Sequence, residues 1–157
     1  MEFNELVDAF ASKYGIEGLS IKDGIAAMSI DGMNCAIVDD AAEDCVTVCG
    51  EIGRPPLHAN GPFGELMLKA NYFLEGSDGS VFSINPETGA YSVFRKIPRP
   101  AADLDALSAA VEKVSNQMSD WKNILNGVNV AEEKAAESES ISNSNFNPLS
   151  GGGFMQV

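Results

Sequence analysis

The chain has 157 residues, of which 45% are hydrophobic, and its formal net charge is -13 with a pI near 4.2. This length predicts one domain with some chain to spare, and the apolar content is sufficient for a hydrophobic core. The negative electrostatic field of such a chain repels nucleic acid and anionic lipid headgroups, so we expect neither as a partner. A negative charge of this size keeps a protein soluble, and it would also suit binding to a basic partner. The composition favours neither explanation over the other.

The N-terminus carries acidic residues where a secretory leader has a basic region and an apolar run, so no signal peptide is expected. No apolar run approaches the ~20 residues that a membrane-spanning helix needs. The three cysteines, Cys35, Cys45 and Cys49, are expected to be free thiols in a reducing compartment. We therefore expect a cytoplasmic protein that does not insert into a membrane.

The hydrophobic pattern predicts three helices and five strands. Helices are expected over residues 2–14, 63–75 and 101–126, where apolar side chains recur at helical spacing. Strands are expected over residues 25–30, 33–38, 45–49, 80–84 and 90–97, and a loop over the Gly- and Pro-rich residues 50–62. The order α-β-β-β-α-β-β-α indicates an α+β fold in which the helices cover one face of an antiparallel sheet.

The C-terminal segment differs from the rest in composition. Residues 129–157 are rich in Glu, Ser, Asn and Gly and predict a flexible tail after a folded domain over residues 1–128. Three glycines near its end precede an apolar tip that contains Phe154, Met155 and Val157. Such a sequence is equally consistent with a tethered segment that binds a protein surface and with an inert chain end.

The sequence contains few residues in an arrangement that could support catalysis. His58 is the only histidine, and no motif places a nucleophile beside it. Cys45 and Cys49 lie ~13 Å apart along one strand, too far for one metal ion or one disulfide. Cys35 could lie near one of them on a neighbouring strand, but buried apolar roles are preferred for all three. Phosphate-binding, dinucleotide-binding and zinc motifs are lacking. We therefore predict a protein that binds partners, is no enzyme and needs neither cofactor nor metal ion.

Several segments together indicate a family. They are the helix end at Tyr14-Gly15-Ile16, the hairpin at Asp31-Gly32, the segment Gly50-Glu51-Ile52-Gly53 and, above all, Leu66-Met67-Leu68-Lys69-Ala70-Asn71-Tyr72-Phe73. With the element order they resemble the Tir chaperone (CesT) family of type III secretion chaperones over roughly residues 1–127. The resemblance implies a homodimeric cytoplasmic chaperone of a Gram-negative bacterium. Such a chaperone binds the N-terminal region of a secreted effector in extended form, keeps it secretion-competent and helps deliver it to the export apparatus.

The resemblance also implies which residues contact partners. The dimer interface would lie on the second helix and the next strand, at Leu66, Met67, Ala70, Asn71, Phe73, Val81, Phe82 and Ile84. Effector-binding candidates on the first helix are Phe3, Leu6, Val7 and Phe10, although several of these must also serve the core. The alternative is a regulatory or immunity-type protein that masks a folded partner.

Overall fold

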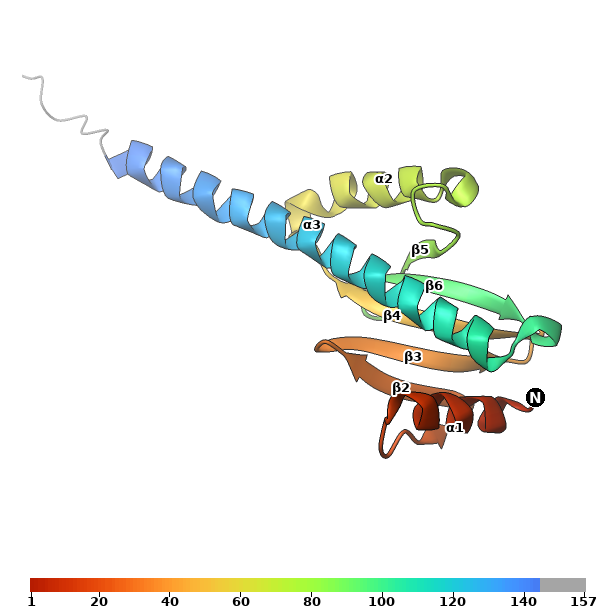
Figure 1. The fold of residues 1–157 in the computed structure, drawn as a ribbon. Helices are drawn as coiled ribbons and strands as arrows, with labels where there is room; N and C mark the ends of the chain where they lie inside the picture. Colours follow the sequence, from red (N-terminus) through yellow and green to blue (C-terminus); the bar gives the residue numbers. More distant parts are fainter. Residues whose placement is uncertain (145–157) are drawn as a thin grey trace, which may run out of the picture.

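The structure is a computed structural model that describes the backbone of residues 1–144 and the side chains of residues 1–127. The helices in this part are α1 (Phe3–Tyr14), α2 (Asn60–Ala70) and α3 (Leu104–Ser144). The strands are β1 (Ile21–Lys22), β2 (Ile25–Ile30), β3 (Met33–Asp40), β4 (Cys45–Gly53), β5 (Val81–Ile84) and β6 (Tyr91–Pro98). They form a two-layer α+β fold (Figure 1), which confirms the predicted fold class.

The sheet has the strand order β1-β2-β3-β4-β6-β5, and every neighbouring pair is antiparallel. The hairpin at Asp31-Gly32 joins β2 to β3, as its turn chemistry predicted. The two edge strands are β1 and β5, and both are short. The open edges of the sheet therefore lie at opposite ends of the domain, one beside α1 and one beside α2 (Figure 1).

The core lies between the sheet and the helices. Alternate residues of the strands, such as Ile37 and Val48, are fully buried and face α1 and α3. Trp121 of α3 anchors the end of this core, because its ring packs against Phe63 of α2 and Phe82 of β5, with centroid distances of 5.8 Å and 4.6 Å. All three helices therefore contribute to one core.

Helix α3 approaches the central strand β4 most closely at Gly50. A Cβ atom at this position would lie 2.0 Å from Sδ and 2.7 Å from Cγ of Met118, which is fully buried. We predict that Gly50→Ala forces Met118 out of its rotamer and lowers the free energy of unfolding by about 1–3 kcal/mol. Urea denaturation checks this, with Gly61→Ala as the control, since a Cβ at Gly61 meets no atom within 4 Å. An equally stable Gly50→Ala variant would contradict the close approach.

A small polar cluster fastens the turn between α2 and β5 to the core. The Lys113 Nζ of α3 lies 2.9 Å from the carboxylate of Asp78, and Arg95 of β6 donates a 2.6 Å hydrogen bond to the Asp78 carbonyl. The hydrogen bond from Lys113 holds the pKa of the Asp78 carboxyl below its ordinary value.

This lowered pKa makes a pH-dependent contribution to stability. A depressed folded-state pKa stabilises the fold above the unfolded-state pKa, and the contribution is lost as pH falls through the folded-state value. We predict that Asp78→Asn lowers the melting temperature slightly at neutral pH, because the pair is exposed, and that the difference vanishes in acid. Thermal melts of both proteins from neutral to acidic pH check the prediction. A difference in melting temperature that persists in acid would contradict it.

Several elements differ from the predicted ones. Helix α2 begins at Asn60, inside the predicted loop over residues 50–62, and ends at Ala70 instead of residue 75, because the left-handed backbone at Phe73 and Leu74 breaks the helix. Strand β3 continues to Asp40 instead of ending at residue 38, because its pairing with β4 extends to Asp40 and Cys45. Strand β4 continues to Gly53, because β6 pairs with it along residues 50–53, which we had assigned to a loop. Strand β1, with only two residues, was not predicted. Helix α3 runs to Ser144 instead of ending at residue 126, since the strong helix formers at residues 131–137 favour helix without an apolar stripe.

The predicted division at residue 128 between a domain and a tail stays a prediction. The first part of the predicted tail, residues 129–144, has helical backbone and continues α3. The predicted tip residues Phe154, Met155 and Val157 lie outside the described residues.

Candidate functional site

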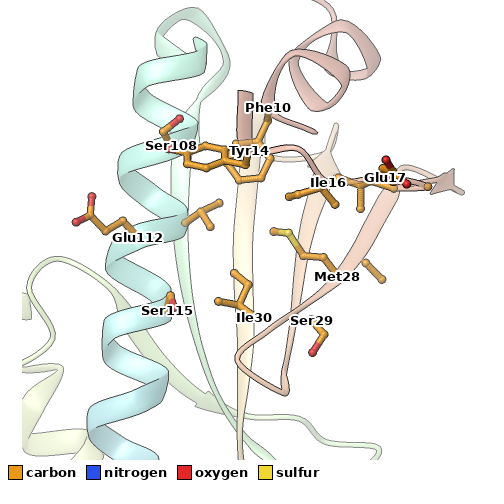
Figure 2. A pocket seen from close by; sticks show the side chains of 14 residues that line it. Phe10, Tyr14, Ile16, Glu17, Met28, Ser29, Ile30, Ser108, Glu112 and Ser115 are labelled. Atoms are coloured by element: carbon orange, nitrogen blue, oxygen red, sulfur yellow. The ribbon is translucent and has the colours of Figure 1, made fainter. Parts of the chain in front are cut away.

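An apolar groove of about 600 Å³ lies where the C-terminal end of α1 meets β2 and α3 (Figure 2). Tyr14 forms its upper wall, and Met28 and Ile30 of β2 form its floor. The lining comes from α1 with the segment that follows it, from β2 and from α3, and consists of Phe10, Tyr14, Ile16, Glu17, Gly18, Leu19, Ala27, Met28, Ser29, Ile30, Ser108, Val111, Glu112 and Ser115. The groove is wide enough for side chains of another molecule and offers them mostly carbon.

The strand along this groove has an unpaired backbone edge. Strand β2 pairs with β3 along its whole length, but β1 pairs only with Ile25 and Ala26. No strand in the described part of the chain pairs with the remaining residues, Ala27–Ile30, on that side, and all four of them belong to the lining of the groove. Free backbone donors and acceptors thus lie directly beside an apolar hollow, which is the arrangement that accepts an added strand.

The four predicted effector-binding residues lie in the core. Phe3, Leu6, Val7 and Phe10 are only 0–5% exposed. Among them only Phe10 lines the groove, and the other three support α1 from beneath. The sequence reasoning missed Tyr14, which is 53% exposed and packs on Phe10 with a ring-centroid distance of 4.8 Å. Its position one turn after Phe10 was the available signal.

A second apolar surface covers the 3-10 turn Leu57–Ala59, α2, the following 3-10 turn Tyr72–Leu74 and β5. It holds most of the large hydrophobic side chains that are exposed in the described part of the chain, namely Leu57, Leu66, Leu68, Tyr72, Phe73, Leu74 and Ile84. A hollow of about 240 Å³ lies within it, between α2 and β5. We call this the α2–β5 surface. Exposed apolar residues gathered in this way mark an interaction surface.

The predicted dimer-interface residues divide between this surface and the core. Leu66, Phe73 and Ile84 are 44%, 79% and 51% exposed. Met67 and Phe82 are buried in the core, and Ala70 and Val81 are half-buried.

Asn71 has a structural task that the sequence did not reveal. Its side-chain amide donates a 3.0 Å hydrogen bond to the Phe82 carbonyl and accepts one of 2.9 Å from the Phe82 amide. This pair of bonds fastens the end of α2 to β5, so that the two elements present one continuous surface.

The backbone at Phe73 and Leu74 is left-handed, with φ of 50° and 57°. This conformation costs a non-glycine residue about 1–2 kcal/mol. Nothing buries the Phe73 ring in return, since its contact is with the equally exposed Tyr72 at a centroid distance of 4.6 Å. The turn therefore holds two aromatic rings toward solvent at an energetic cost, which is common where a surface has a binding role.

The remaining candidates for chemistry are dispersed. Burial raises the pKa of the Cys35 thiol to about 12 and also raises that of Cys49, so both stay protonated and weakly reactive. Cys35 and Cys45 are buried and free, and His58 lies exposed in the 3-10 turn before α2. Within residues 1–127 no three His, Cys, Asp or Glu side chains gather closely enough to hold a metal ion. None of the described helices is both long and apolar enough to cross a membrane.

An open strand edge beside an apolar groove, with a second apolar surface at the opposite edge, is the architecture of a protein-binding domain. The sequence model of the Tir chaperone protein (CesT) family matches residues 5–122, so the chain belongs to this family. A search of curated proteins found no sequence that matches it significantly.

Solved structures share the fold at low sequence identity. A chain of the HopA1–SchA chaperone–effector complex is 20% identical with a TM-score of 0.65, and the match covers 77% of this chain and 93% of that one. A chain of the ExsC–ExsE complex is 15% identical with a TM-score of 0.64, covering 78% and 92%. A chain of the heterodimeric ExoU–SpcU complex from the type III secretion system of Pseudomonas aeruginosa is 15% identical with a TM-score of 0.61, covering 76% and 97%.

Proposed function

We propose that this protein is a cytoplasmic effector chaperone of a type III secretion system. It binds the N-terminal region of a secreted effector in extended form, keeps it soluble and hands it to the export apparatus. Family membership supports the chaperone class, and the similar folds come from structures of chaperone–effector and other type III secretion complexes. The task needs binding surfaces and no catalytic group, cofactor or metal ion.

The observation that carries this proposal is the coincidence of the groove with the unpaired edge at Ala27–Ile30. An extended segment added along β2 would satisfy backbone hydrogen bonds that water now satisfies. Every second side chain of that segment would point to the helix side of the sheet, between Tyr14 and the floor of Met28 and Ile30. A folded partner could not present its backbone in this way without an exposed strand of its own.

The α2–β5 surface is proposed as the homodimer interface. It holds the strained turn with Phe73, the hollow between α2 and β5, and the second open edge of the sheet. A twofold axis through this surface would place two copies of the exposed aromatic pair against each other. The two β2 grooves would then lie at the far ends of the dimer, each free to hold a stretch of one effector chain.

Co-expression with the products of neighbouring genes tests the proposal. We expect a dimer of about twice 16.6 kDa that captures one product, and loss of capture when that product's N-terminal segment is deleted. Light scattering on a sizing column measures the mass of the protein alone and of the complex. Capture of a folded domain that does not depend on its N-terminal segment would instead support a regulatory protein that masks a folded partner.

A further inference from the structure

Two carboxylates flank the apolar groove. Glu17 lies in the segment between α1 and β1 on one side of the groove, and Glu112 lies on α3 on the other side, with its carboxylate toward the outer side of that helix (Figure 2). Both side chains are exposed, and neither forms an ion pair with any described residue. The groove lining includes no lysine or arginine. The groove is therefore apolar at its floor and negative at its two rims.

Two lysines that lie close in sequence to lining residues of the groove are already paired. Nζ of Lys13 lies 3.5 Å from the Asp105 carboxylate and donates a 3.2 Å hydrogen bond to the hydroxyl of Ser108. Lys113, which follows Glu112 on α3, pairs with Asp78 at 2.9 Å. Lys13 and Lys113 are thus each paired with an acid of this chain, whereas Glu17 and Glu112 have no such partner among the described residues.

The chain's own C-terminal tip does not supply the positive charge that would complement Glu17 and Glu112. No lysine or arginine follows Lys134, and the tip itself reads Phe154-Met155-Gln156-Val157. The net charge of -13 adds a general attraction for cations, but at physiological salt fields are screened within about 8 Å, so the two rim carboxylates dominate at the groove. A complementary occupant must come from another chain.

We propose, on the basis of the proposed chaperone function, that the groove selects an extended segment whose apolar side chains alternate and are flanked by lysine or arginine. The alternation follows from strand addition along Ala27–Ile30, where only every second side chain enters the groove. The flanking cations lie beside Glu17 and Glu112 once the apolar side chains are seated. The apolar floor supplies affinity, and the rims choose among apolar segments by their charge.

Three fluorescein-labelled peptides test this on the full-length protein. All share the core Leu-Thr-Leu-Thr-Leu and are flanked on both sides by lysine, by glutamine or by glutamate. Fluorescence anisotropy measures their dissociation constants. At low salt we expect the lysine peptide to bind about three- to tenfold more tightly than the glutamate peptide, with the glutamine peptide between them. The differences should collapse at about 1 M salt, where the Debye length is about 3 Å.

A matched pair of variants locates the effect. Glu17→Gln with Glu112→Gln should bring the three dissociation constants together, while Glu51→Gln with Glu87→Gln, which removes the same charge away from the groove, should keep their order. Three equal affinities in the unmodified protein, or an order that survives in the rim variant, would overturn the inference. Binding of the glutamine peptide would then still support the chaperone proposal, whereas no binding of any peptide would contradict both.

Discussion

Replacing Leu66 and Phe73 together by aspartate should convert the proposed dimer into a folded monomer of 16.6 kDa. Both side chains are well exposed in the single chain, at 44% and 79%, so neither is needed for its core. In a twofold dimer each substitution acts twice, and burial of one such side chain contributes about 1.5–3 kcal/mol. The dissociation constant of the dimer should therefore rise by at least about a thousandfold. Light scattering on a sizing column at micromolar concentration measures the change.

The control for this experiment is Ile25→Asp. Ile25 has the same 44% exposure as Leu66 but lies on β2, at the opposite end of the sheet. We expect this variant to remain dimeric. Circular dichroism should show the same helix content for all forms, which separates dissociation from unfolding. A double variant that stays dimeric, or an unmodified protein that is already monomeric, would contradict the α2–β5 surface as the dimer interface.

Apolar periodicity was sufficient to predict the layers of this fold, because it records which side of each element faces the core. The stripe of Phe3, Leu6, Val7 and Phe10 correctly predicts α1 and its buried side. The same pattern cannot separate a chain's own core from a partner surface, since both require apolar side chains at the same spacing. The family resemblance implies effector contacts for these four residues, several of which must also serve the core, and the structure shows all four buried.

The binding surfaces themselves depend on tertiary contacts that no local pattern encodes. The groove forms because the loop after Tyr14, the edge of β2 and the middle of α3 meet in space. The open edge exists because β1 stops after two residues, a length below what strand patterns detect. On α2, Leu66 and Met67 are adjacent in sequence, yet Leu66 is exposed and Met67 is buried, because Met67 lies one turn after the buried Phe63 on the side of α2 that faces the core.

Replacing Tyr14 by glutamate should weaken effector capture while leaving self-association unchanged. Tyr14 forms the wall of the groove above Met28, and its 53% exposure means that the fold tolerates the change. A carboxylate there would face the apolar side chains of the added segment and lose the tyrosine contact, which is worth about 1.5–3 kcal/mol when fully buried. We therefore expect affinity for the effector's N-terminal segment to fall by about tenfold or more.

Tyr72→Glu is the matched control for this prediction, because Tyr72 is also an exposed tyrosine, at 71%, and lies on the α2–β5 surface. It should weaken the dimer and leave the intrinsic affinity of each groove for the segment unchanged. Titration of the labelled segment against both variants, combined with their masses in solution, separates the two surfaces. If Tyr14→Glu bound the segment as tightly as the unmodified protein, the effector would have to lie elsewhere. Strand addition at β2 would bring the segment into contact with Tyr14, so unchanged binding would exclude the groove. The face of the sheet opposite the helices would then be the next surface to test.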